Sequence, residues 1–279
     1  MRPALAGARL LVPFLVGLAL SLAAPVVAGT SEPGVNLRWD NCYGDGGAWN
    51  KAFACDSNVL GEQLVGSIEL DQTITRVNSI QFVVDIVAAS PALPAWWSLA
   101  RSGGCRSTSL DLNPFQYPPS SACVPWSAGP YGGGLGTYSA GPQGPASARV
   151  TGAVAVSIDH LGTLSPGTEY FVFRLTIDHA KTVGTGACTG CNEPVCIFLS
   201  RVSLFQQGQS MAAIHLERGA NFLGSQYVTW QNGYPIDVHH ECDPSVPFCA
   251  RQYTAFGCVL AGPTSGRRST WGAVKSLYR

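Results

Sequence analysis

Charged side chains are scarce in this chain of 279 residues, and neither sign dominates. Asp, Glu, Lys and Arg make up 12% of the residues, and 17 basic side chains balance 17 acidic ones to a formal net charge of zero. Proteins that bind DNA or RNA usually gather Lys and Arg on one face to neutralise phosphates. The composition therefore argues against a nucleic-acid partner.

Long hydrophobic runs are missing after the N-terminal segment. Residues 1–28 combine a basic start at Arg2 and Arg9 with an apolar run over 10–24 and small residues at 26–28, which is the pattern of a cleavable secretory signal. No later stretch approaches the roughly 20 apolar residues that span a bilayer. We therefore expect a secreted or cell-surface protein with no membrane span once the signal is removed, the alternative being that residues 1–28 are a membrane anchor.

The sequence also lacks the short motifs of common active sites. It contains no G-x-S-x-G nucleophile elbow, no H-E-x-x-H zinc helix, no glycine-rich phosphate loop and no dinucleotide fingerprint. Its densest polar cluster comprises Asp237, His239, His240 and Asp243. These histidines can bind zinc or act as a general base, although neighbours in an extended chain point opposite ways. An exported hydrolase that uses this cluster, with or without a metal, is the alternative to a non-enzymatic protein.

Cysteine, in contrast, is plentiful. The ten cysteines are Cys42, Cys55, Cys105, Cys123, Cys188, Cys191, Cys196, Cys242, Cys249 and Cys258. An even number in an exported chain predicts a disulfide framework. The simplest hypothesis is pairing between neighbours in sequence: Cys42 with Cys55, Cys105 with Cys123, and two of the three within 188–196. The C-x-x-C in that last group is also the pattern of a redox pair or half a zinc site, but no second C-x-x-C follows.

Alternating apolar residues predict strands. The clearest case follows the Pro-Gly turn at 166–167, where Phe171, Phe173, Leu175 and Ile177 alternate with a second set of residues. This period of two predicts a half-buried antiparallel strand with one set in a core. Further strands are expected over 35–39, 63–70, 79–87, 148–160, 195–205 and 224–230, with 210–216 as a strand or a short helix.

The predicted fold class is all-β: a disulfide-stapled antiparallel β-sandwich with long Gly/Pro-rich loops. Residues 29–260 are expected to form it as one elaborated domain, between the signal at 1–28 and a tail at 261–279. The tail has four basic residues and no acid, and its Trp271, Val274 and Leu277 recur at three-residue spacing. It is predicted to form a small amphipathic helix that docks on a partner or directs sorting, the alternative being a loosely docked terminus.

Glycine and proline crowd residues 103–147, which predicts loops and excludes a long regular element there. The stretch is nevertheless aromatic, and Trp126, Tyr131 and Tyr138 are candidate ligand-binding residues on it. Trp97 joins them, because the adjacent tryptophans of the A-W-W segment would point to opposite faces of a strand, and an outward ring can stack on a sugar. The alternative is that these rings pack beneath loops.

The turn at 40–47, D-N-C-Y-G-D-G-G, contains carboxylates that can hold a hard cation such as calcium. Its spacing is not that of an EF-hand loop. The alternative is a plain disulfide-closed turn, so no cofactor is predicted outright, and calcium at this turn remains the alternative.

Two sets of motifs resemble known proteins. The run L-S-P-G-T-E-Y at 164–170 resembles the L-x-P-x-T-x-Y corner of fibronectin type III domains, where the Tyr bonds back to the backbone, and this implies a sandwich without implying chemistry. Over most of the mature chain, the W-x-x-C, F-A-C, A-W-W, G-x-C-R and T-V-G-T-G-x-C-x-G-C motifs resemble a recurrent family of exported, cysteine-rich bacterial proteins of uncharacterised activity. That family ends in S-T-W-G-x-x-K-S-L-Y-R and implies no catalytic residues.

These features together predict a non-enzymatic exported β-sandwich protein for cell-surface structure, adhesion or glycan binding. Its expected partner is a glycan or another cell-surface component.

Overall fold

The structure is a computed structural model that describes residues 34–114, 122–127, 129–208, 214–217, 225–237 and 256–260. The predicted signal at 1–28 and the predicted tail at 261–279 lie outside these ranges, so the domain boundaries stay predictions. No helix among the described residues is both long and apolar enough to cross a membrane.

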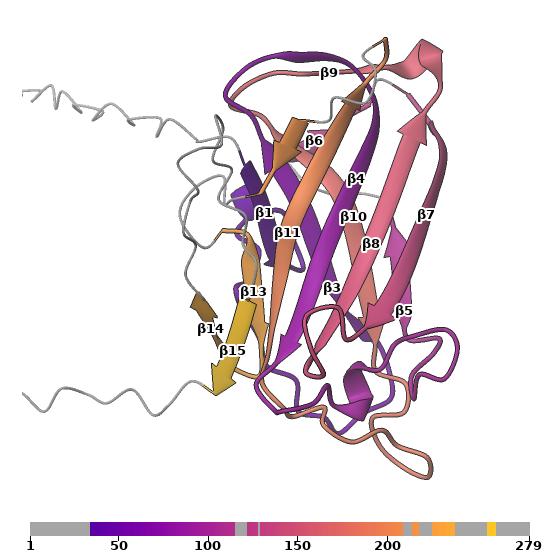
Figure 1. Cartoon of the computed structure of the whole chain (residues 1–279), viewed down its shortest axis with the longest axis vertical. Helices are drawn as coiled ribbons and strands as arrows, with labels where there is room; N and C mark the ends of the chain where they lie inside the picture. Colours follow the sequence, from indigo (N-terminus) through magenta and orange to yellow (C-terminus); the bar gives the residue numbers. More distant parts are fainter. Residues whose placement is uncertain are drawn as a thin grey trace, which may run out of the picture. The chain divides into compact units, whose positions relative to one another are not determined.

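Two sheets pack face to face, as Figure 1 shows, and confirm the all-β sandwich. The first sheet runs in the order β1 (Gly34–Trp39), β3 (Gly61–Glu69), β10 (Glu169–Asp178) and β5 (Leu110–Asn113), with β6 (Cys123–Pro125) parallel to β10. The second runs β2 (Asn50–Lys51), β13 (Tyr227–Trp230), β11 (Val195–Gln206), β4 (Ile74–Ala88), β8 (Ser147–Val156) and β7 (Tyr131–Ala140). Two short strands extend it, β12 (Ile214–Leu216) beside β11 and β9 (Gly162–Leu164) beside β4.

Smaller elements complete the described fold. A hairpin of β14 (Gly233–Asp237) and β15 (Phe256–Leu260) forms a separate two-stranded sheet. Three short 3-10 helices, η1 (Tyr43–Asp45), η2 (Ala95–Trp97) and η3 (Ile158–His160), lie in the connections. The expected strands at 35–39, 63–70, 79–87, 195–205 and 224–230 overlap strands of the structure, and 210–216 contains β12. The strand expected over 148–160 ends at Val156, and Ile158–His160 forms η3 instead.

Two stacked phenylalanines join the sheets at the centre of the core. Phe173 on β10 and Phe82 on β4 stack with ring centroids 4.2 Å apart. Each ring also covers a glycine directly across its own sheet, Gly66 for Phe173 and Gly152 for Phe82. A Cβ added at either glycine would collide with the ring. The small residues thus set how closely the two layers approach.

The β10 strand confirms the most strongly patterned prediction and corrects one part of it. The hydroxyl of Tyr170 accepts a hydrogen bond from the backbone N–H of Ser165 at 2.8 Å, which fixes the turn before the strand. Beyond this turn, the expectation that one face lies outside holds only for the C-terminal half of β10. Phe171 was expected on the same face as Phe173, but the strand register shifts between these two residues. Phe171 therefore lies on the outer face, where it is fully buried against Val65 and the Cys42–Cys123 disulfide.

The stretch at 103–147 contains a long regular element, contrary to expectation. The ten-residue β7 pairs with β8 along its length, from Tyr131 opposite Val156 to Ala140 opposite Ala148. Glycine weakens a strand on its own. Here the adjacent β8 supplies a complete partner ladder, and this tertiary pairing overrides the local preference.

The adjacent tryptophans were also placed wrongly by the strand hypothesis. Trp96 and Trp97 lie in η2, and both side chains are fully buried. Pro94 precedes the helix and disfavours a paired strand there. A helical turn, unlike a strand, lets two consecutive rings enter the same core.

The disulfide pairing is long-range, so the hypothesis of pairing between sequence neighbours is wrong. The bonds are Cys42–Cys123, Cys55–Cys191, Cys105–Cys188 and Cys196–Cys258. They join residues 62 to 136 positions apart, because the sheets bring segments that are distant in sequence next to one another. Cys242 and Cys249 lie outside the described residues. Four disulfides indicate an oxidising environment outside the cytoplasm.

Candidate functional site

A groove lies between strands β5 and β7, where both sheets end on the same side of the sandwich. It has a volume of about 540 Å³. Within the described chain, β5 pairs only with β10, and β7 pairs only with β8, so each is an edge strand. Figure 1 shows these two strands at one margin of the described sandwich, β7 from one sheet and β5 from the other.

The groove exists because the inward positions of β7 carry little side-chain volume. Gly134 lies opposite Val154 and Tyr138 lies opposite Val150, and both valines belong to the core. Gly134 and Gly136 therefore sit on the inner face of β7, where other strands contribute large side chains. The side chain of Leu112 from β5 comes so close to Gly136 that an added Cβ would collide with it. The groove is therefore narrow at Gly136, where Leu112 approaches, and open beside Gly134.

The floor of the groove is apolar. Leu99 and Val150 are almost completely buried at its base, and the half-buried Leu110 and Leu112 form the β5 side. Ligand-binding pockets usually measure about 300–1,000 Å³, so the groove has a suitable size, and polar groups line it beside these aliphatic side chains.

A few polar groups surround this floor. The hydroxyl of Tyr138 donates to the backbone oxygen of Trp97 at 2.5 Å, and burial raises the pKa of Tyr138 to about 12. The phenol is therefore neutral and fixed in place at physiological pH. Arg101 and Asp111 lie exposed at the rim, and neither has an ion-pair partner within the described part of the chain. Both charges are available to a ligand.

The structure places the four predicted aromatic residues in different surroundings. Tyr138 forms part of the groove wall. Tyr131 is half-buried, with its ring centroid 5.7 Å from that of Trp126. Trp97 and Trp126 are 0% and 1% exposed, so their rings fill the core and have no free face for a sugar. The groove was missed by the sequence reasoning, although the alternate glycines of Y-G-G-G-L-G-T-Y carried the signal.

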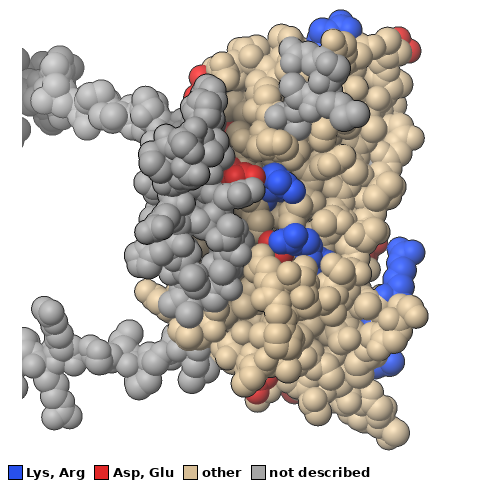
Figure 2. All heavy atoms as spheres, in the orientation of Figure 1, with Lys and Arg blue, Asp and Glu red and all other residues tan. Residues whose placement is uncertain are grey.

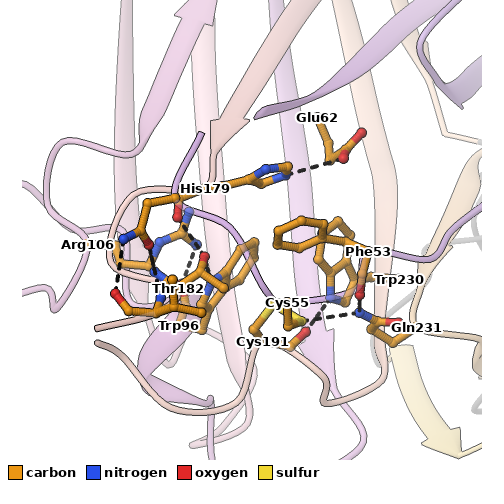
Figure 3. Close-up of a disulfide and its surroundings, with 12 residues drawn as sticks. Phe53, Cys55, Glu62, Trp96, Arg106, His179, Thr182, Cys191, Trp230 and Gln231 are labelled. Carbon is orange, nitrogen blue, oxygen red and sulfur yellow. Dashed lines mark hydrogen bonds and ion pairs between the residues drawn. A yellow bond between two sulfur atoms is a disulfide. The ribbon is translucent and has the colours of Figure 1, made fainter. Parts of the chain in front are cut away.

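A second concentration of polar and aromatic groups surrounds the Cys55–Cys191 disulfide, as Figure 3 shows. The guanidinium of Arg106 lies 3.5 Å from the ring centroid of Trp96 and donates to the backbone oxygens of Trp96, Ala180 and Asp178. Burial lowers the pKa of Arg106 to about 10, with Asp178 opposing the shift. The ring of Trp96 in turn stacks on Trp230 with centroids 5.1 Å apart. This cluster closes the end of the sandwich as a packed plug.

His179 belongs to the same plug. Its ring stacks on Phe53 with centroids 3.7 Å apart and is 4% exposed. Nδ1 lies 2.9 Å from the carbonyl oxygen of Val59, so this nitrogen carries a hydrogen, and Nε2 lies 3.2 Å from a carboxylate oxygen of Glu62. Glu62 also pairs with Lys51 at 2.6 Å. The imidazole is too deeply buried for a substrate to reach it. Its contacts instead have a structural role, because they hold the loop that carries Val59.

The acids of the proposed calcium turn have protein partners. Asp40 pairs with Lys51 at 2.8 Å, and Asp45 accepts a hydrogen bond from the backbone N–H of Ala122 at 3.3 Å. Across the described ranges, no group of three or more His, Cys, Asp or Glu residues is arranged to hold one metal ion. The residues of the hydrolase alternative lie mostly outside the described ranges. His239, His240 and Asp243 are not described, and Asp237 is described only by its backbone.

A buried carboxylate stabilises the same turn. Glu169 accepts hydrogen bonds from the backbone N–H groups of Tyr43 and Gly44, each at 2.9 Å, and from the hydroxyl of Ser67. Burial raises the pKa of Glu169, and these hydrogen bonds offset part of the shift. The carboxylate ties η1 to the outer face of the first sheet and has a structural role.

Charge is sparse on the face drawn in Figure 2, in keeping with the composition.

Among the sites described above, the groove between β5 and β7 best combines open space, an apolar floor and exposed polar groups. The chain matches no protein-family model and no curated protein sequence.

Proposed function

We propose that this chain is an exported, non-enzymatic recognition protein of the cell surface or extracellular space, which binds a surface component in the β5–β7 groove. The observation that carries the proposal is the open side of the sandwich, where two edge strands flank an apolar floor. The two charges at its rim have no ion-pair partner within the described ranges. Such a site serves adhesion or surface assembly.

The chemistry of the lining residues supports binding rather than catalysis. With a pKa of about 12 and its hydroxyl donated to a backbone oxygen, Tyr138 is a poor general base. Arg101 and Asp111 orient ligands through charge and hydrogen bonds. The N-terminal pattern and the four disulfides support export.

The test compares the mature full-length protein with two glycine variants of β7. Gly134→Leu places a side chain in the groove, whereas Gly133→Leu adds the same side chain at a position where nothing lies within 4 Å of an added Cβ. Binding is measured on a glycan array and on intact cells, after circular dichroism has shown equal melting temperatures. We expect wild type and Gly133→Leu to bind, and Gly134→Leu to bind at least about tenfold more weakly. Equal binding by all three proteins, or no binding by any, would contradict the proposal.

A further inference from the structure

We propose that the occupant of the groove is an extended polypeptide segment of a partner protein, which adds as a strand to the free edge of β7. This inference rests on the proposed function, because it assumes that the groove is the binding site. It identifies the class of ligand and the way in which the ligand is held.

The exposed edge of β7 is the first argument. The strand is ten residues long, and its sequence Y-G-G-G-L-G-T-Y-S-A contains neither a charged residue nor a proline. Natural edge strands are usually protected against pairing by Lys, Pro, short length or a covering segment. Residues 132–137 are all exposed, and Leu135 in their midst is 67% exposed. Among the described residues β7 pairs only with β8, so its other side offers backbone N–H and C=O groups to an incoming strand.

The position of the groove is the second argument. A strand added beside β7 continues the pleat, so alternate side chains of the added segment point toward the other sheet. On β7 these inward positions include Gly134, which leaves the adjacent space open, and Gly136, which is covered by the side chain of Leu112. Aliphatic side chains of the incoming segment would enter that space and contact Leu99 and Leu110 on the floor. Backbone pairing and burial of apolar side chains then act together.

The charges define the segment further. The central residues must be neutral, because β7 has no charge to pair with them. At the rim, Arg101 and Asp111 are the two charged lining residues, and they call for one acidic and one basic residue on the partner. The fitting segment is therefore proline-free, aliphatic at alternate positions and zwitterionic at its ends.

Two other occupants fit less well. A second copy pairing through its own β7 would again present glycines at the inward positions and would leave the groove empty. A glycan can fill the groove but has no backbone amides to satisfy the edge of β7. The polypeptide is the occupant that uses both features.

The experiment uses an N-acetylated, C-amidated peptide E-S-V-T-V-S-V-K, fluorescently labelled, with the mature full-length protein. A matched control peptide, E-V-V-S-T-S-V-K, has the same composition without strict alternation. We expect the first peptide to bind at least about tenfold more tightly than the second in fluorescence anisotropy. Gly134→Leu should lose this preference, and Gly133→Leu should retain it.

Hydrogen exchange supplies a readout that does not depend on a variant. The backbone amides of residues 131–140 in wild-type protein should exchange more slowly with the alternating peptide than with the control, because strand addition hydrogen-bonds them. Unchanged exchange, or equal affinity for the two peptides, would overturn the strand-addition inference.

The failures can be told apart. If Gly134→Leu abolishes glycan binding while neither peptide binds, the groove is a recognition site but its ligand is a glycan. If sedimentation velocity shows a wild-type dimer that Gly134→Leu leaves intact and both peptides fail, self-pairing replaces the proposed partner. If no variant changes binding to any ligand, the proposed function fails as well.

Discussion

Phe82 lies directly opposite Gly152 in the pairing of β4 with β8, and its ring covers that glycine while stacking on Phe173 of the other sheet. Replacing Gly152 by alanine forces the ring away from both contacts. We expect Gly152→Ala to lower the free energy of unfolding by about 1–3 kcal/mol, the usual cost of overpacking a core. The midpoint of urea denaturation measures it.

Gly133→Ala is the matched control for this prediction. Gly133 also lies in a strand, but nothing lies within 4 Å of an added Cβ. Its free energy of unfolding should change by no more than about 0.5 kcal/mol. Equal effects of the two alanines would show that the ring contact is not what constrains Gly152.

Arg106 provides a second prediction. The guanidinium donates to three backbone oxygens and stacks on Trp96, a set of contacts that the ammonium of lysine cannot reproduce. We expect Arg106→Lys to destabilise the protein by about 2–4 kcal/mol. Thermal unfolding followed by circular dichroism gives the size of the effect. The exposed Arg101 serves as control, and Arg101→Lys should leave the melting temperature nearly unchanged.

The pairing of the cysteines can be checked chemically. Proteolysis of the oxidised protein without reductant, followed by mass spectrometry, should yield peptides cross-linked through Cys42–Cys123, Cys55–Cys191, Cys105–Cys188 and Cys196–Cys258. Removing one of these bonds by a double Cys→Ala substitution should cost about 2–5 kcal/mol, because each closes a long loop. A peptide joining Cys42 to Cys55 would contradict the structure.

The raised pKa of Glu169 leads to a prediction of how the free energy of unfolding depends on pH. Burial raises its pKa in the folded state, so the folded protein binds this proton more tightly than the unfolded chain does. The contribution of Glu169 to stability is therefore fully present below the unfolded value of 4.5 and is lost as pH rises through the raised folded pKa. Relative to Glu169→Gln, the wild-type protein should lose stability as pH increases above 4.5.

Urea denaturation of both proteins at a series of pH values from about 4 to about 8 tests this prediction. The difference in unfolding free energy, wild type minus Glu169→Gln, should decrease as pH rises above 4.5 and should level off once pH exceeds the raised folded pKa. A difference that instead grows with pH would mean that the hydrogen bonds from Tyr43, Gly44 and Ser67 outweigh the effect of burial.

Local patterns in the sequence were sufficient for most strands and insufficient for their long-range connections. The strands β10 and β11 could be predicted because β-branched and aromatic residues recur there with strand spacing. The partner of Cys55 could not, since it lies 136 residues away and is set by how the sheets return the chain. The strand β7 was missed because its glycines have low strand propensity, and only β8 makes the pairing favourable.

The candidate site was only partly predictable for a related reason. Tyr138 was identified as a binding residue from its aromatic character, and it lines the groove. The groove itself arises from what β7 lacks, namely inward side chains at Gly134 and Gly136, opposite a strand more than 20 positions away in sequence. Trp97 and Trp126 have the same aromatic character as Tyr138, but packing places them in the core.

The bond between Cys196 and Cys258 determines how the protein bears mechanical load. Cys258 is the middle residue of β15, and Cys196 lies near the start of β11, which is hydrogen-bonded to β4 along most of its length. A pulling force applied to the chain beyond Leu260 therefore passes through a covalent bond into the middle of the larger sheet. The hydrogen bonds between β14 and the part of β15 before Cys258 therefore do not carry that force.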